Sequence, residues 1–156
     1  MKALYYGALA AVVAIASLAQ AQPVKKQVGD RERLIGAWHL AHIDSPGLDG
    51  KPSPVPQPKG MLIYTRDGHM SVQLMYPKSA NPQSNEYVQD GYEASFGSYD
   101  VDEGKHIVTY HVQGSVTRDL LVGMDLPRVY LFTADGHLII RSAQVDEHWS
   151  VTWEHY

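Results

Sequence analysis

The sequence predicts an all-β fold, a single antiparallel eight-stranded barrel with one short helix. The first reason is that short apolar runs, separated by turn signals, follow one another along most of the 156 residues, and no long amphipathic helix pattern is present. The second reason is that well-formed strands are expected at both ends of this region. Such a chain suits a closed barrel, where the first strand pairs with the last and no edge remains exposed.

The first half of this region contains three predicted strands. The first covers residues 34–43. Residues 45–58 contain five prolines and two glycines, so we predict a loop there, because proline has no amide donor for a sheet. Strands at residues 61–65 and 70–76 follow. The Asp-Gly pair at residues 67–68 indicates a hairpin between them, because glycine accepts the positive φ of a tight turn.

The second half repeats this pattern of strands and turns. Residues 77–82 are predicted to be a loop, and residues 85–91 are the one predicted helix, with Ser84 as its N-terminal cap. Two further hairpins are predicted, one around an Asp-Glu-Gly-Lys turn and one around a second Asp-Gly pair. The remaining strands are predicted at residues 98–101, 106–114, 128–133, 137–142 and 148–154.

The amino-terminal segment has the three parts of a cleavable secretory signal peptide. A lysine at position 2 gives a positive start, residues 3–18 are mostly apolar, and Ala19 and Ala21 are small residues where a signal peptidase cuts. We therefore expect residues 1–21 to be removed by cleavage between Ala21 and Gln22. The mature protein is then expected to be periplasmic or secreted, with no membrane anchor after cleavage.

Domain organisation and composition narrow the possible functions. We expect a flexible arm at residues 22–33 and one barrel domain at residues 34–156. The formal charge of −4 argues against nucleic acid and anionic membranes as partners. The absence of cysteine excludes disulfides and thiol chemistry. The eight histidines show no known metal-ligand spacing and no phosphate-binding loop is visible, so we expect no metal and no cofactor.

Six segments form an ordered set along the chain. They open with Leu34-Ile35-Gly36-Ala37-Trp38 and continue with residues 59–65, 67–73, 96–101, 111–115 and 151–154. This set resembles the lipocalin-like domain family over residues 34–154, and its first segment resembles the Gly-x-Trp opening of lipocalins. The resemblance implies an eight-stranded calycin-type barrel whose interior holds a small apolar molecule, with Trp38 at the closed end. It implies no particular reaction.

Six side chains in or beside the apolar strands are candidates for the site. A polar group there must face water or meet a partner inside the barrel, and strand alternation leaves both orientations open. Tyrosine suits a ligand wall because it joins an apolar body to one hydroxyl. The resemblance also implies a structural alternative, because lipocalin-like barrels often stack an arginine of a late strand on the opening tryptophan. Arg128 or Arg141 could make this cation–π contact with Trp38. The ligand-binding candidates are Tyr64, Gln73, Tyr99, His111, Arg128 and Trp153, with His111 as the candidate catalytic residue.

Three functions are compatible with these features. The favoured one is binding of a small hydrophobic molecule inside the barrel, because burial of an apolar ligand needs no specific catalytic group. The second is a cofactor-free isomerase, cyclase or lyase. In it His111 is the general acid or base, and Gln73 and Arg128 orient the substrate or stabilise an oxyanion. The third is an interaction module of the cell envelope that docks through residues 45–58. The oligomeric state is not predicted.

Overall fold

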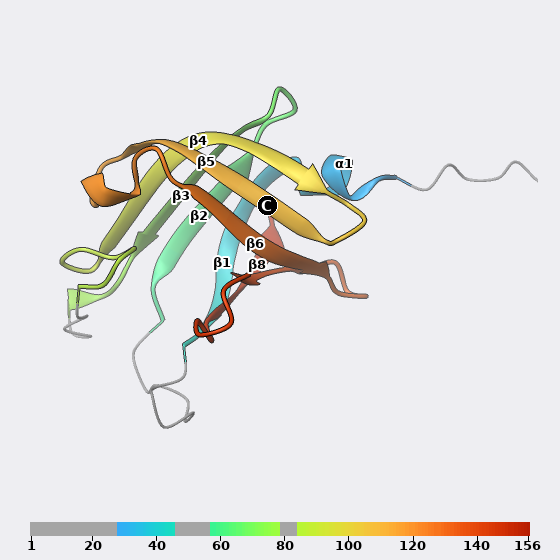
Figure 1. The fold of residues 1–156 in the computed structure, drawn as a ribbon. Helices are drawn as coiled ribbons and strands as arrows, with labels where there is room; N and C mark the ends of the chain where they lie inside the picture. Colours follow the sequence, from blue (N-terminus) through green and yellow to red (C-terminus); the bar gives the residue numbers. More distant parts are fainter. Residues whose placement is uncertain (1–27, 46–56, 79–83) are drawn as a thin grey trace, which may run out of the picture.

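The computed structural model describes residues 28–45, 57–78 and 84–156 (Figure 1). Within these residues eight antiparallel strands close into a barrel, in which each strand pairs with the next and the last pairs with the first. The predicted fold class is therefore confirmed. The predicted signal peptide and most of the two proline-containing loops lie outside the described residues. The strands are β1 (Gly36–Asp44), β2 (Lys59–Tyr64), β3 (His69–Met75), β4 (Tyr92–Asp102), β5 (Ile107–Ser115), β6 (Asp125–Phe132), β7 (Leu138–Ser142) and β8 (Ser150–His155).

Both predicted Asp-Gly hairpins are present. Between β2 and β3 the amide of Thr65 donates to the carbonyl of His69 at 2.9 Å, and Gly68 has a φ of +90°. Between β6 and β7 an equivalent bond of 2.9 Å closes the turn, and Gly136 has a φ of +93°. Glycine occupies both left-handed positions because it lacks the Cβ that makes this backbone unfavourable.

The short helix lies in a different place from the predicted one. It is α1 (Asp30–Leu34), so the end of the expected arm is helical and the first strand begins only at Gly36. The prediction of a helix at residues 85–91 is wrong, because this stretch forms turns. There the side-chain oxygen of Asn85 accepts hydrogen bonds from the amides of Tyr87 and Val88 at 2.8 and 2.7 Å. Such a local bond competes with helix formation.

A bulge in β1 changes which of its side chains point inward. Simple alternation places Trp38, Leu40 and His42 on one face. The register of β1 against β8 shifts between Leu40 and His42, so the alternation is interrupted there. As a result His42 is exposed, and Ile43 lines the interior instead.

Trp38 closes one end of the barrel, as the resemblance implied. Its side chain is buried, and its Nε1 donates a hydrogen bond to the carbonyl of Leu34 at 2.8 Å. The ring of His155 packs edge-on against it, with 4.6 Å between ring centroids. Gly36 has a φ of +140°, and a Cβ at this position would lie 2.2 Å from Nε2 of His155. The glycine therefore makes room for the histidine ring.

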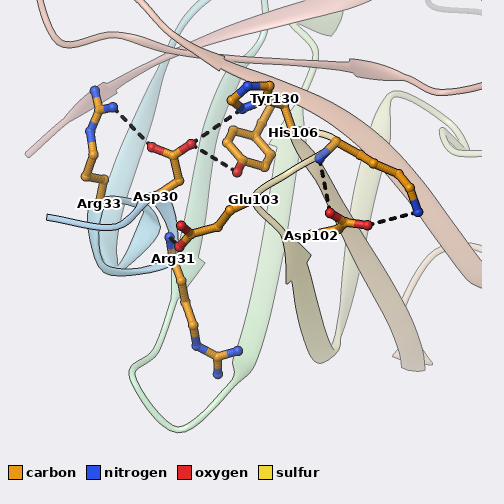
Figure 2. A network of polar contacts seen from close by, with 8 residues as sticks. Asp30, Arg31, Arg33, Asp102, Glu103, His106 and Tyr130 are labelled. Carbon is orange, nitrogen blue, oxygen red and sulfur yellow. Dashed lines mark hydrogen bonds and ion pairs between the residues drawn. The ribbon is translucent and has the colours of Figure 1, made fainter. Parts of the chain in front are cut away.

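Polar contacts hold α1 against this closed end (Figure 2). The Asp30 carboxylate pairs with an arginine of its own helix at 3.2 Å and accepts a hydrogen bond from the Tyr130 hydroxyl at 3.2 Å. Nδ1 of His106 lies 3.5 Å from the same carboxylate. The amide of Arg31 donates to Glu103 at 2.9 Å, and Figure 1 shows α1 beside the turn that joins β4 to β5. With this end covered, access to the interior is expected from the opposite end.

The inward-facing side chains form one continuous core. At the closed end it is aromatic, with Tyr64, Tyr99 and Tyr130 almost fully buried. Toward the opposite end the inward side chains of the strands are mainly aliphatic, and a cavity lies among them. None of the helices in the described residues is long and apolar enough to cross a membrane.

Candidate functional site

A cavity of about 120 Å³ lies inside the barrel, toward the end away from α1. Its mouth is formed by Ser45 at the end of β1, Tyr76 after β3 and Trp149 before β8. Small-molecule sites are typically apolar cavities with a few polar groups, and this one fits that description. Most of its wall is apolar and includes Leu62, Val72, Leu74, Leu126, Ile140 and Val151.

Arg128 places a guanidinium group in this cavity. It belongs to the inward-facing residues of β6 and is only 4% exposed. The guanidinium carbon lies 5.0 Å from the ring centroids of both Tyr87 and Trp149. These two rings are themselves joined through Glu147, which accepts a hydrogen bond from the Tyr87 hydroxyl at 3.1 Å and from Trp149 Nε1 at 2.9 Å. Arg128 is therefore held at the mouth by an aromatic clamp, Tyr87 and Trp149.

The cation–π contact predicted for Trp38 is not found among the described residues. Arg128 lies in the clamp, and Arg141 is exposed. Arg33 of α1 lies instead 3.8 Å from the ring centroid of Phe132, which packs 6.3 Å from the ring of Trp38. The closed end thus contains the guanidinium of Arg33, but the ring of Phe132 lies between it and Trp38.

Glu93 adds a carboxyl group to the cavity wall. It lies near the start of β4, on the same side of the strand as the buried Ser95 and Tyr99. Burial raises the pKa of Glu93 to about 7, and the charge of Arg128 opposes part of this increase. The carboxyl group therefore changes its protonation near neutral pH, where a general acid or base is most effective.

Tyrosines form the floor of the cavity. Tyr110 lines it, and its hydroxyl shares a hydrogen bond with the hydroxyl of Tyr64. Burial raises the pKa of Tyr110 to about 12 and the pKa of Tyr64 well above its usual value, so both phenols are neutral. Tyr99 packs on Tyr64 at 4.9 Å and donates its hydroxyl to the carbonyl of Thr65 at 2.9 Å. The predicted residues Tyr64 and Tyr99 thus lie beneath the cavity and support its floor.

Trp153 lines the cavity from β8. Its side chain is buried, and its Nε1 has no hydrogen-bond partner within the described residues. An indole N–H can only donate, and a buried donor without an acceptor costs about 1–3 kcal/mol. An oxygen atom on a bound molecule would remove this cost.

His111 lies on the outer wall of the barrel. Because Tyr110 and Val112 face inward along β5, His111 points outward. Its Nδ1 lies 2.6 Å from Asp125 and its Nε2 3.1 Å from Asp100, on the two neighbouring strands. Hydrogen bonds to these carboxylates raise the pKa of His111. The expectation that His111 acts on a molecule inside the barrel is therefore not supported. Instead, its side chain links β5 to the two neighbouring strands on the outer surface.

Gln73 also faces away from the interior. It is an exposed residue of β3, and its side-chain amide donates to the hydroxyl of Ser71 at 2.8 Å. The inward positions of this strand are Met70, Val72 and Leu74, which are all apolar. Gln73 therefore does not contribute to the cavity.

Residues 35–155 match the family profile described as a lipocalin-like domain. The chain belongs to the lipocalin-like domain family. A comparison with curated proteins found no match. Membership of this family suggests small-ligand binding in general, which agrees with the cavity.

The structure brings two of the six predicted residues, Arg128 and Trp153, to the cavity wall of this lipocalin-like barrel. Sequence reasoning missed Glu93, although a signal exists. Side chains two residues apart in a strand lie on the same face, and Glu93 lies six residues before Tyr99 in β4. If Tyr99 is taken as a buried aromatic residue, the alternation therefore predicts that Glu93 points inward. No comparable signal exists for residues of the connecting segments.

The polar groups of the lipocalin-like cavity define what it can do. Within the described residues, no group of three or more His, Asp or Glu side chains is placed to hold a metal ion. The cavity offers hydrogen-bond donors at Arg128 and Trp153 and a carboxyl group at Glu93 that exchanges a proton near neutral pH. It can therefore enclose an apolar molecule and bind an oxygen atom on it.

Proposed function

We propose that this protein binds a small hydrophobic molecule inside its barrel. The observation that carries the proposal is the apolar cavity of about 120 Å³, which has hydrogen-bond donors in its wall. An apolar cavity of roughly 150 Å³ holds benzene. This cavity is slightly smaller but of the same order and open at its mouth, so we expect it to take a molecule of about one aromatic ring. Family membership supports the same function in general terms.

We also propose that the protein acts outside the cytoplasm. The support is the signal-peptide pattern of residues 1–21, with its positive start, apolar centre and small residues before Gln22. The proposed ligand is then a molecule present in the periplasm or the medium. Fractionation of cells that express the chain, followed by mass spectrometry of its amino terminus, tests this. A mature protein that begins at Met1 in the cytoplasm would refute it.

Calorimetric titration with small neutral aromatic molecules, benzamide and benzyl alcohol, tests ligand binding. Val72 lines the cavity, whereas Met75 of the same strand is exposed. Val72→Phe fills the cavity with an added ring, and Met75→Phe adds a similar ring outside. We expect saturable binding by the wild-type protein and Met75→Phe, and at least tenfold weaker binding by Val72→Phe. Equal binding by all three would show that the molecules bind elsewhere, and no binding by any of them would refute the proposal.

A cofactor-free isomerase, cyclase or lyase is the second candidate, and the observation that favours it is Glu93. A buried carboxyl group with a pKa of about 7 is suited to move a proton within a bound substrate. This role replaces the one predicted for His111. Once a substrate is found, Glu93→Gln should abolish turnover, while His111→Gln should leave it unchanged. The reverse result would place the chemistry outside the barrel.

A further inference from the structure

We propose that the cavity selects a ring-sized molecule that carries one oxyanion, a carboxylate or a phenolate, which binds to Arg128 and Trp153. This inference rests on the proposed binding function and adds the chemical class of the ligand. Three features support it: a buried cation with unused donors, a second buried donor beside the cavity, and a nearby carboxyl group that does not oppose an anion below neutral pH.

The first feature is the incomplete pairing of Arg128. A guanidinium group has five N–H donors. Within the described residues Nη1 of Arg128 donates to the carbonyl of Pro127 at 3.2 Å, and a polar contact of the guanidinium with the Tyr87 hydroxyl opposes part of the increase that burial causes in the pKa of Tyr87. The ion pairs found in the described residues all involve other side chains. Against the effect of burial, hydrogen bonds and the charge of Arg128 across the clamp lower the pKa of Glu147, but that carboxylate accepts its hydrogen bonds from Tyr87 and Trp149. A cation that is 4% exposed is costly to bury without a partner in direct contact. An anionic ligand supplies that partner, and an apolar ligand does not.

The second feature is the indole N–H of Trp153. It is buried, it lacks an acceptor among the described residues, and its ring shares the cavity wall with Arg128. A carboxylate has two oxygens with about four sites that accept hydrogen bonds. It can therefore accept from the guanidinium and the indole together, whereas an amide carbonyl has one oxygen and no charge.

The third feature is the state of Glu93. An ionised Glu93 would repel an anionic ligand, but burial raises its pKa to about 7. The other titratable and charged groups of the cavity wall are Tyr76, Tyr87, Tyr110 and Arg128, and burial raises the pKa of Tyr87 to about 12. Tyr76 and Tyr110 have pKa values raised by burial and are neutral. Below pH 7 Glu93 is therefore mainly a neutral O–H donor to the same oxyanion.

The test compares two molecules of the same size in calorimetric titrations of the purified protein at pH 6. Benzoate carries a carboxylate, and benzamide carries a neutral amide on the same ring. Hydrogen bonds to charged groups are stronger than neutral ones, so we expect benzoate to bind at least tenfold more tightly than benzamide. Equal affinities would overturn the oxyanion inference and leave the proposed function intact. If neither molecule binds, both are refuted.

Variants identify the donors. Arg128→Met removes the charge and should reduce the preference for benzoate to less than threefold. Arg141→Met is the matched control, because it removes an exposed arginine of β7, the strand next to β6, and should keep the full preference. Trp153→Phe removes the N–H together with part of the indole ring, so the measured quantity is the difference between the two ligands. It should weaken benzoate binding by about three- to tenfold more than it weakens benzamide binding. A preference that persists in folded Arg128→Met would refute the assignment.

A spectroscopic measurement avoids the risk that Arg128→Met fails to fold. The indole N–H resonances of the wild-type protein are recorded during titration, and Trp153→Phe identifies the signal of Trp153. Benzoate should move this signal to lower field, as expected for a new hydrogen bond to an anion, and benzamide should move it less. An unchanged Trp153 signal at saturation with benzoate would overturn the proposed contact.

Discussion

Replacing Glu93 by glutamine is predicted to stabilise the protein at alkaline pH and to have little effect in acid. Glu93 lies in the wall of the cavity, where burial raises the pKa of its carboxyl group from 4.5 to about 7. The folded protein therefore holds this proton to a higher pH than the unfolded chain does. Glutamine has nearly the same shape and never ionises, so the variant isolates the cost of charging this position.

The sign and the size follow from proton linkage. Where the folded state binds more protons than the unfolded state, the free energy of unfolding falls as the pH rises. For Glu93 this loss begins near pH 4.5 and is complete above pH 7, and a pKa increase of this size corresponds to about 3 kcal/mol. At pH 8 Glu93→Gln should thus be more stable than the wild-type protein by about 3 kcal/mol, or about 10 °C in Tm. At pH 4.5 the difference should be below about 0.5 kcal/mol.

Urea unfolding of the wild-type protein and Glu93→Gln at pH 4.5 and pH 8 measures both differences. Asp119→Asn is the matched control, because Asp119 is an exposed acidic residue in the segment between β5 and β6, and its effect should stay within about 0.5 kcal/mol at both pH values. If Glu93→Gln is instead less stable than the wild-type protein at pH 8, Glu93 is ionised in the folded state and stabilised by Arg128. That result would refute the assignment of a neutral carboxyl group.

Three further predictions concern the barrel around the site. Gly97→Ala should lower the free energy of unfolding by about 2–4 kcal/mol, because its Cβ would lie 2.0 Å from the backbone carbonyl oxygen of His111. Gly104→Ala is the control and should be nearly neutral. Chemical denaturation compares the two variants, and equal stabilities would show that the neighbouring strands move apart at little cost in free energy. Tyr110→Phe should lower the free energy of unfolding by about 1–2 kcal/mol, because the hydroxyl of Tyr64 loses its buried partner. The double variant with Tyr64→Phe should lose less stability than the sum of the two single variants, and additive losses would contradict a hydrogen bond between the two hydroxyls. His111→Gln should lower the free energy of unfolding by less than about 1 kcal/mol at pH 5.5 and by almost nothing at pH 9. The reason is that the pKa of His111 is raised in the folded state, so its contacts stabilise the fold only at pH values where the imidazole is protonated. A larger loss at pH 9 than at pH 5.5 would contradict ion pairs with the two aspartates.

Much of the fold was predictable because its signals are local. The Asp-Gly pairs that precede His69 and His137 mark hairpins through the backbone freedom of glycine, which is the same in any context. The helix was misplaced for a local reason too, since Asn85 is equally able to cap a helix and to close a turn. Tertiary contacts decide such cases, and α1 is helical where polar contacts hold Asp30 against the barrel.

The site was predictable only in part. Arg128 and Trp153 reach the cavity because their strands keep regular alternation from one end to the other. His111 and Gln73 were candidates for the interior, and the structure places both outside. For Gln73 a signal exists, because Met70, Val72 and Leu74 alternate with polar residues and mark the opposite face of β3 as the inner one. In β5 the orientation of His111 is harder to predict, because the outer side of this strand contains the apolar Ile107 as well as polar residues.

The sequence by itself determined a closed barrel of eight antiparallel strands, because turn residues and strand periodicity act over a few neighbouring positions. The tertiary structure alone decided the composition of the site. Tyr87 and Trp149 come from separate connecting segments, and they meet Arg128 of β6 only when the barrel closes. The protonation of Glu93 likewise depends on burial by residues distant in the chain, because desolvation is a property of the assembled cavity and not of the residue.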